Sequence, residues 1–327
     1  MMTNSYEAES LKNLARFDFL DVCLLGETGT GKTHTARLIH ELSPRKHKPF
    51  IAVNCAELSA SIIEAELFGY ERGAFTGAVS SKTGKFEAAA SGTLFLDEIG
   101  ELNNDMQAKL LKVVEEKCIT RVGSVVPRAI DLRIIYATNH DLSAFREDLR
   151  YRVAAHTIKL KPLRERQEEI VPLANQFVTD FSRKSGREIL VGKNALQVLY
   201  CADWRGNVRE LRSFIEKVCL DAIFQADLDK HSEIKTATPE LTAEILLSYL
   251  PQSAGFTGKK RIFVEKYGSS NLSATDYRKE IKDHDRNLIE MMLKKNNGNV
   301  SRTAVALGFS RYGLIKKIKR YNIVFDK

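Results

Sequence analysis

The sequence has no long apolar run, no secretory-signal pattern and no paired cysteines. Because no stretch reaches about eighteen consecutive apolar residues, no membrane-spanning helix is expected. The N-terminus, Met-Met-Thr-Asn-Ser-Tyr-Glu, lacks the basic and then apolar order of a signal peptide. The five cysteines are scattered without a Cys-x-x-Cys pair, which argues against a zinc site or a disulfide framework. These absences predict a cytoplasmic protein that makes no use of a membrane.

The positive charge of the chain is unevenly placed. The formal net charge is +8, and residues 277–327 hold thirteen Lys or Arg against five Asp or Glu. The residues before them carry equal numbers of the two signs. Since a local cationic field attracts nucleic acid, the last sixth of the chain is predicted to bind it.

Short apolar runs separated by helical stretches predict a parallel sheet that is covered on both faces, and hence an α/β fold. The expected strands are 21–25, 50–53, 93–96 and 132–137, and the first expected helices are 6–16 and 32–42. After residue 162 the pattern becomes helical, with no clear strand. The expected domains are an ATPase-like α/β subdomain at 1–162, an α-helical lid at 163–226, a linker at 227–276 with one helix around 240–250, and a small all-α domain at 277–327.

A glycine-rich segment follows the first expected strand and opens a predicted helix. Gly26-Glu27-Thr28-Gly29-Thr30-Gly31-Lys32-Thr33 fits the phosphate-loop pattern G-x-x-x-x-G-K-[ST]. The glycines let the backbone curl until its N–H groups point at phosphate, and the helix dipole adds positive potential there. In such a loop the lysine reaches the β- and γ-phosphates and the last hydroxyl binds Mg²⁺. The whole segment is therefore predicted to bind ATP.

An acidic strand end supplies the partner of this loop. In Gly92-Thr93-Leu94-Phe95-Leu96-Asp97-Glu98 the apolar residues predict a buried strand. Asp97 is expected to hold Mg²⁺ through water, and Glu98 to polarise the attacking water beside the γ-phosphate. Gly92 is counted with the nucleotide-binding residues. The two motifs together predict a Mg²⁺-dependent ATPase.

A six-residue run, Gly73-Ala74-Phe75-Thr76-Gly77-Ala78, lies between these motifs and follows Glu66-Leu67-Phe68-Gly69-Tyr70-Glu71-Arg72. Glycines near both ends and a single aromatic suit a mobile surface loop with one apolar contact point. In this context the run resembles the signature of the bacterial enhancer-binding proteins, which are AAA+ activators of sigma-54 RNA polymerase. The resemblance extends over roughly residues 20–225, and it implies that the loop contacts sigma-54.

The resemblance also assigns roles to polar residues elsewhere. Asn54 matches the residue that senses the nucleotide state and holds the catalytic glutamate, with a strand-end cap as the other interpretation. Thr138-Asn139 matches the first sensor, and Arg209 matches the second sensor, with a plain surface position as its alternative. Arg146 and Arg152 match arginine fingers that reach the ATP of a neighbouring subunit, which implies a ring oligomer, in this family a hexamer.

The chain departs from the family pattern at several places. Arg150 stands where an aromatic residue is more usual, so the resemblance leaves open which of Arg146, Arg150 and Arg152 reach the phosphate. Arg205 replaces the usual proline of the lid motif. The segment before the first helix is short, which leaves open how adenine is held. Since no sensory domain precedes the ATPase, regulation in trans or by abundance is expected.

The last segment has the pattern of a helix-turn-helix. An amphipathic helix is expected at 283–295, and 299–320 predicts two helices joined at Gly308. Leu314 and Ile318 are expected to pack inward with Ile315, leaving a basic face free to enter a major groove. The segment resembles the Fis-type helix-turn-helix of many enhancer-binding proteins. The residues expected to contact DNA are Arg302, Ser310, Arg311, Tyr312, Lys316, Lys317 and Lys319.

The sequence thus predicts a sigma-54-dependent transcriptional activator. It is expected to bind double-stranded DNA upstream of promoters, to form a ring, and to hydrolyse ATP with Mg²⁺ while remodelling the sigma-54 closed complex. The alternative is an AAA+ DNA-binding regulator that represses, or acts on another polymerase form, and uses ATP to control its oligomeric state. An AAA+ machine that remodels protein or DNA, such as a helicase, is a third interpretation. A regulatory protein acting in trans is a further expected partner.

Overall fold

The computed structural model of the chain describes residues 5–57, 59–229, 238–249 and 299–307, together with positions 286, 289, 290, 293, 314, 315, 318 and 323. The chain divides into two compact units. The first comprises Met1–Ile189, Ala202–Pro239 and Tyr249–Phe256, and the second comprises Leu190–Cys201, Glu240–Ser248 and Thr257–Lys327.

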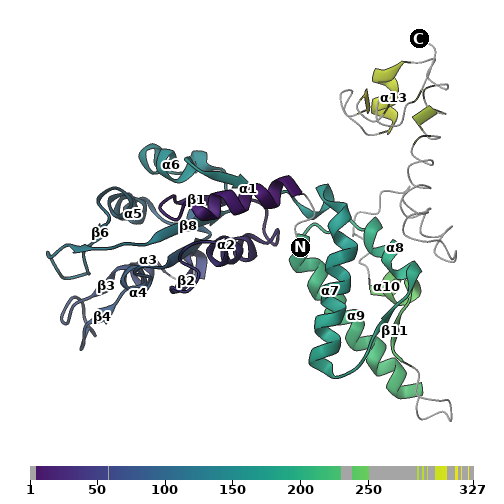
Figure 1. Cartoon of the computed structure of the whole chain (residues 1–327), viewed down its shortest axis with the longest axis horizontal. Coiled ribbons are helices and arrows are strands. Elements are labelled where there is room, and N and C mark those ends of the chain that lie inside the picture. The colour runs from purple at the N-terminus through teal and green to yellow at the C-terminus, as the bar shows by residue number, and fades with distance from the viewer. Residues whose placement is uncertain are drawn as a thin grey trace. The chain divides into compact units, whose positions relative to one another are not determined.

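The first unit is built on a five-stranded parallel sheet with the strand order β2-β5-β8-β1-β9 (Figure 1). The strands are β1 (Val22–Leu25), β2 (Phe50–Asn54), β5 (Thr93–Asp97), β8 (Arg133–Thr138) and β9 (Thr157–Lys159). The first four confirm the strands expected from the apolar runs. The sequence pattern does not predict β9, because its three residues are partly exposed and form no apolar run. In a parallel sheet the carboxyl ends of all strands meet at one edge, where ligands bind.

Helices cover both faces of this sheet, as expected. One face is packed by α1 (Ser5–Arg16) and α2 (Lys32–Glu41), and the other by α3 (Ala60–Phe68), α4 (Lys85–Ala88), α5 (Asn104–Glu116) and α6 (Glu147–Ala154). Alternate strand residues serve the two faces. In β8, Ile134 and Tyr136 pack with α3–α6, whereas Ile135 and Ala137 pack with α1 and α2. Every residue of β8 is therefore buried, and the strand reads as a continuous apolar run.

Two short antiparallel hairpins extend the first unit, and the sequence pattern predicts neither. β3 (Gly69–Tyr70) pairs with β4 (Lys82–Thr83), and β6 (Cys118–Ile119) pairs with β7 (Arg128–Ala129). A β-bridge between Tyr70 and Val122 holds the two hairpins side by side. Strands of two residues have no periodicity that a sequence pattern could reveal. Single-turn 3-10 helices complete this part of the chain: η1 (Cys55–Glu57), η2 (Ile99–Glu101), η3 (Leu142–Ala144), η4 (Leu163–Glu165) and η5 (Gln167–Glu169).

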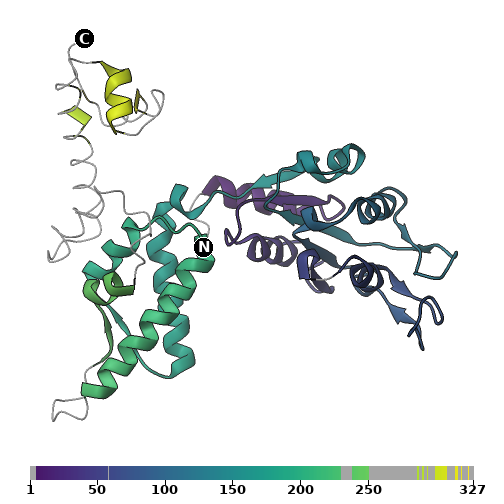
Figure 2. The same cartoon turned by 180° about the vertical axis from the view of Figure 1, so that it is seen from behind.

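Helices α7 (Ile170–Ser185) and α9 (Asn207–Asp229) of the first unit lie side by side in both views (Figure 2). The chain between them forms α8 (Lys193–Cys201). Just before α8, β10 (Leu190–Val191) pairs with β11 (Glu240–Leu241), so the expectation of no strand in this region is wrong. Both strands are two residues long, and their pairing joins segments far apart in the chain. The following α10 (Ala243–Tyr249) confirms the helix expected around 240–250.

The described part of the C-terminal segment contains one complete helix, α13 (Val300–Leu307). Asn299 caps it, because its side-chain oxygen accepts a hydrogen bond from the Arg302 backbone N–H at 3.0 Å. A buried cluster includes Leu314 and Ile318, which confirms that these two residues pack inward. Arg302 is exposed on α13. The other residues expected to contact DNA lie outside the described residues: Ser310, Arg311, Tyr312, Lys316, Lys317 and Lys319.

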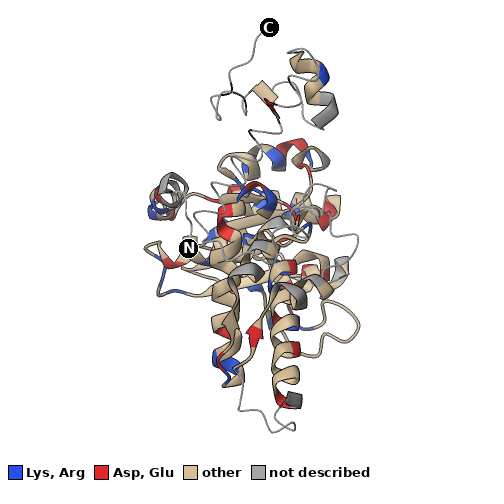
Figure 3. Ribbon diagram, turned by 90° about the vertical axis from the view of Figure 1, so that its right-hand side faces the viewer, with Lys and Arg blue, Asp and Glu red and all other residues tan. Residues whose placement is uncertain are grey.

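Acidic and basic residues are interspersed along the described ribbon (Figure 3), in keeping with the even charge balance before residue 277. Among the helices that the structure describes, none is long and apolar enough to cross a bilayer.

A buried arginine fixes the first helix to the sheet. Arg133, at the start of β8, is fully buried, and its guanidinium donates hydrogen bonds to the carbonyls of Leu14, Ala15 and Leu20 at 3.1, 3.4 and 2.9 Å. Two of these carbonyls belong to the last turn of α1, where helical carbonyls lack partners and carry negative potential. Burial lowers the pKa of Arg133, and the nearby Asp21 opposes that shift. The C-terminal end of α1 is therefore held by one side chain.

Replacing Arg133 with Met should lower the free energy of unfolding by about 3 kcal/mol, because three carbonyls lose a charged donor. Chemical denaturation monitored by circular dichroism measures this. Lys112→Met is the control, since Lys112 is exposed and pairs only across one helical turn with Glu116. That change should cost less than about 0.5 kcal/mol. Equal stability of the two variants would contradict the assigned role.

Candidate functional site

The phosphate loop joins β1 to α2, as the sequence motif predicts. Gly29 and Gly31 have φ of +80° and +102°, a region that residues with a Cβ rarely adopt. Gly31 is the N-cap of α2, so the loop ends at the positive end of a helix. The Lys32 ammonium donates to the Gly26 carbonyl at 2.9 Å. The loop is thus curled around its own lysine.

A cavity of about 830 Å³ opens beside this loop, within the first unit. One end is polar and is formed by residues 28–33 with Asp97 and Glu98. The rest of the lining includes five apolar residues from α1, α2 with its C-cap, and α7, called the apolar end below: Leu11, Leu38, Leu42, Leu173 and Phe177. Charged residues such as Arg166, Glu169 and Arg212 line the cavity beside them. The volume lies within the usual range of ligand pockets, about 300–1,000 Å³. A ligand with a charged end and a flat apolar end fits this division.

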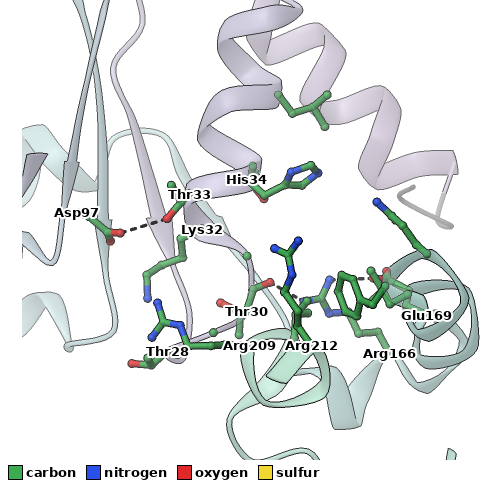
Figure 4. A pocket seen from close by; sticks show the side chains of 18 of the residues that line it. Thr28, Thr30, Lys32, Thr33, His34, Asp97, Arg166, Glu169, Arg209 and Arg212 are labelled. Carbon is green, nitrogen blue, oxygen red and sulfur yellow. Dashed lines mark hydrogen bonds and ion pairs between the residues drawn. The ribbon is translucent and has the colours of Figure 1, made fainter. Parts of the chain in front are cut away.

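Two carboxylates at the carboxyl end of β5 face the loop. The Thr33 hydroxyl donates to the Asp97 carboxylate at 3.3 Å (Figure 4). The Lys32 ammonium lies 3.7 Å from the Glu98 carboxylate. Glu98 has a left-handed backbone, with φ of +52°. Its second carboxylate oxygen is buried, and within the described residues it has no hydrogen-bond partner. An acceptor held unpaired beside a phosphate site is suited to polarise a water molecule.

The residues expected to sense the nucleotide lie close to this edge. Asn139 donates to the Thr28 hydroxyl at 3.3 Å, and the Thr138 carbonyl accepts from the Gly26 N–H at 3.3 Å. Asn54 lies next to Asp97 in the sheet register. Its amide donates to Glu57 at 2.8 Å, and no hydrogen bond is described between Asn54 and Glu98. The structure therefore brings these three residues to the site, with Asn54 bonded to a different carboxylate from the one expected.

Gly92 lies at the other end of β5 and does not line the cavity. A Cβ on Gly92 would stand 2.1 Å from the Pro49 carbonyl oxygen. The glycine thus permits close backbone packing at the start of the strand, and the structure does not bring it to the nucleotide site.

The candidate finger arginines lie on or next to α6 and do not line the cavity of their own chain. Arg146 pairs with Asp148 at 2.9 Å, and Arg152 lies 3.8 Å from Glu115. Both side chains are exposed. Neither can complete the site within one chain in this arrangement.

Further arginines line the cavity from the helical part of the first unit, which comprises residues 163–189 and 202–229. Arg209, expected from the sequence, lies near Thr28 and Lys32 (Figure 4). Arg166 and Arg212 also line the cavity, and the sequence pattern did not indicate them. The Arg212 guanidinium lies 5.3 Å from the centre of the Phe177 ring. No motif marks these residues, since their role depends on how α7 and α9 pack.

The six-residue run 73–78 forms the loop of the β3–β4 hairpin. It is closed by a backbone hydrogen bond from the Gly73 N–H to the Ala78 carbonyl at 2.9 Å. Phe75 is 46% exposed although its ring packs edge-on against Tyr70, with centroids 4.9 Å apart. Thr76 is exposed and Ala78 is buried. The loop is therefore a defined turn that presents an aromatic ring to solvent.

Four charged residues tie this loop to the β6–β7 hairpin. Arg121 donates to Glu87 at 2.6 and 2.8 Å and to Glu71 at 3.2 Å. Arg128 adds contacts to Glu71 at 3.1 Å and Glu87 at 3.4 Å. The Arg121 hydrogen bonds hold the pKa of Glu87 below its usual value. No sequence pattern indicates this cluster, which joins residues of the β3–β4 hairpin, α4 and the β6–β7 hairpin.

Comparison with known proteins gives a family to each part of the chain. Residues 3–159 match the Sigma-54 interaction domain, 164–237 the AAA+ ATPase lid domain, and 280–321 the Fis family of bacterial regulatory proteins. The regulatory protein AtoC of Escherichia coli (strain K12) is 40% identical over 309 residues, covering 92% of this chain and 62% of AtoC. The Nif-specific regulatory protein of Azospirillum lipoferum is 50% identical over 202 residues, covering 60% of this chain and 32% of that protein.

The sigma54-dependent transcriptional regulator SfnR of Pseudomonas fluorescens (strain Pf0-1) is 44% identical over 229 residues, covering 67% of this chain and 62% of SfnR. The chain thus spans from a third to three fifths of the length of these relatives. The crystal structure of NtrX from Brucella abortus in complex with ADP is similar, with a TM-score of 0.65 and 26% identity over 99% of this chain and 70% of that chain.

Replacing Glu87 with Gln should loosen both hairpins, because Arg121 loses its charged acceptor. At pH 7 the loss of stability should be about 1–2 kcal/mol, with faster amide hydrogen exchange in residues 69–83 and 118–129. A depressed folded-state pKa stabilises the protein above the unfolded pKa of about 4.3 and loses that effect as pH falls. The difference from the parent should therefore shrink in acid. Glu64→Gln, which removes an exposed ion pair with Lys109, is the control. A difference that is constant with pH would speak against the ionic cluster.

Proposed function

The chain belongs to the sigma-54-interacting AAA+ regulators that carry a Fis-type DNA-binding domain, and from this membership we propose that it activates transcription by ATP-driven remodelling of sigma-54 RNA polymerase. The observation that carries the proposal is the exposed Phe75 on a hairpin that charged contacts fix to the ATPase body. Such a loop can transmit force to a partner only if its base is held.

ATP is the proposed nucleotide. Its phosphates would lie on the N–H groups of the loop and the Lys32 ammonium, at the positive end of α2. Its base would occupy the apolar end of the cavity, near Leu11 and Phe177. This placement is the proposed means by which adenine is held. The ADP and ATP complexes known for NtrX support a nucleotide in this fold.

Mg²⁺ is the proposed metal. Thr33 and Asp97 offer hydroxyl and carboxylate oxygens, which are the ligands that Mg²⁺ prefers, and they lie 3.3 Å apart. Phosphate oxygens of the nucleotide and water would supply the remaining ligands. The ion would offset phosphate charge, while Glu98 accepts a proton from the attacking water.

Ring formation would complete the site. Arg146 and Arg152 are exposed and stand outside the cavity of their own chain. We propose that they stabilise charge on the phosphoryl group bound by a neighbouring subunit, in a hexameric ring. Hydrolysis would then depend on assembly.

A continuous set of contacts links the site to the loop. Asn54 is the register partner of Asp97, and its amide bonds to Glu57 in η1. Helix α3 begins at Ala60, close after η1, and leads directly into β3 and the Phe75 loop. A movement of the carboxylates after hydrolysis would thus be passed along α3 to the hairpin. Residues 277–327 would hold the ring at DNA upstream of the promoter.

Glu98→Gln should leave ATP bound within about threefold of the parent affinity but lower kcat by about 10³-fold, because the amide cannot accept the proton. Binding of a fluorescent ATP analogue and steady-state phosphate release measure the two quantities. Glu101→Gln is the matched control, since Glu101 is nearby and exposed and bonds to His140. Full turnover by the Glu98 variant would remove this residue from the catalytic role.

Phe75→Ala and Thr76→Ala should strongly reduce open-complex formation while sparing ring assembly, DNA binding and most ATP turnover. Loss of about 2 kcal/mol at one anchoring aromatic would reduce promoter opening by about 30-fold. The assay uses purified sigma-54 polymerase, promoter DNA and ATP. Val79→Ala is the control, because Val79 is 80% exposed and lies just outside the run. A regulator that represses predicts no such uncoupling, and parent-rate opening by the Phe75 variant would refute the proposal.

A further inference from the structure

Two segments of the helical part form hydrogen bonds to the phosphate loop. These are the connector, residues 163–166, and the segment 204–209, called the turn below, which comprises the turn at 204–206 and the first three residues of α9. Together they contact four consecutive loop residues, Glu27 to Thr30. All of these residues belong to the first unit.

Asn207 makes the central hydrogen bonds between these segments and the loop. It is fully buried, and its backbone has a φ of +56°, which asparagine tolerates better than most residues. Its side-chain oxygen accepts from the Leu163 N–H at 2.7 Å, and its amide donates to the Thr28 carbonyl at 3.0 Å and to the Glu27 carboxylate at 3.2 Å. One side chain therefore joins the connector, the turn and the loop.

Glu27 of the phosphate loop adds an ion pair with the connector. Arg164 donates two parallel hydrogen bonds to its carboxylate, at 2.8 and 2.5 Å. The Arg164 hydrogen bond lowers the pKa of Glu27 to about 2. Glu27 does not line the cavity, although the phosphate-loop motif counts it with the ATP-binding residues. Its carboxylate is directed to the connector and the turn.

The turn approaches the loop so closely that no side chain fits between them. A Cβ on Gly29 would stand 2.3 Å from the Gly206 carbonyl oxygen. The Val208 N–H donates to the Gly29 carbonyl at 2.9 Å, and Arg209 is the next residue. From the connector, Arg166 donates to the Thr30 carbonyl at 2.6 Å (Figure 4). Two of the three arginines that line the cavity therefore lie at or next to a residue bonded to the loop, Arg166 directly and Arg209 through Val208.

We propose that Glu27, Arg164 and Asn207 form a latch that fixes the turn on the phosphate loop and so positions Arg209 toward the bound nucleotide. Glu27 is then a positioning residue that acts through Arg209. The inference rests on the proposed ATPase function of the same site. It predicts that removing the latch lowers kcat/KM for ATP only while Arg209 is present.

A double-mutant cycle on the full chain tests this. Glu27→Gln, Arg209→Ala and the double variant are compared by kcat and KM for ATP and by the dissociation constant of a fluorescent ATP analogue. Glu27→Gln should lower kcat/KM by about tenfold in the parent and by less than about twofold in the Arg209→Ala background. Lys112→Met, at an exposed pair within α5 whose residues do not line the cavity, should change neither value. Arg164→Gln provides a second route to the same loss, since its side chain is exposed and its removal leaves the core intact.

Arg164→Gln should reproduce the Glu27→Gln loss, and combining the two should add nothing further. Losses that multiply between Glu27→Gln and Arg209→Ala would overturn the latch, as would parent kinetics in both latch variants. These failures leave the ATPase activity of the parent intact. A parent protein that neither binds nor hydrolyses ATP would instead overturn the proposed function, and the latch with it.

Discussion

A phosphate-binding loop must keep its backbone N–H groups free for the ligand, and its carbonyl groups must then find donors elsewhere. In this chain several of the carbonyl groups of residues 26–30 accept hydrogen bonds from outside the loop. Lys32 donates to Gly26, Asn207 donates to Thr28, and the Val208 N–H in the first turn of α9 donates to Gly29. The conformation of the loop therefore depends on residues outside it, and the helical part supports the site structurally.

Charge is used in two distinct ways around this centre. Arg133 is fully buried and stabilises carbonyl groups at the end of α1, which lines the apolar end of the cavity. Arg121 and Arg128 lie at the base of the hairpins and pair with carboxylates that are partly solvent-accessible. The first arrangement makes one part of the ATPase body rigid. The second can rearrange at modest cost, because exposed and half-buried ion pairs are weaker than buried ones.

The parts of this structure that follow from local rules could be predicted from the sequence. Four strands, the phosphate loop and the acidic strand end each depend on a continuous run of residues, and all were placed within about two residues. The hairpins, β9 and the β10–β11 pair could not be predicted, since they are two or three residues long and their pairing is non-local. The partner of Asn54 could not be inferred either, because Glu57 competes for an amide that the family pattern gives to Glu98. Phe177 and Arg212 reach the cavity only through the packing of α7 and α9.

Gly29 is subject to a steric constraint that the phosphate-loop motif does not state. The pattern G-x-x-x-x-G-K-[ST] leaves that position open, and phosphate chemistry alone would accept other residues there. In this fold the Gly206 carbonyl oxygen occupies the space that any Cβ would need. The group that excludes a side chain at position 29 therefore lies some 180 residues downstream, at Gly206 in the turn before α9. Transplanting the loop into another P-loop protein would remove this steric limit and leave only the preference for glycine that the φ of +80° imposes.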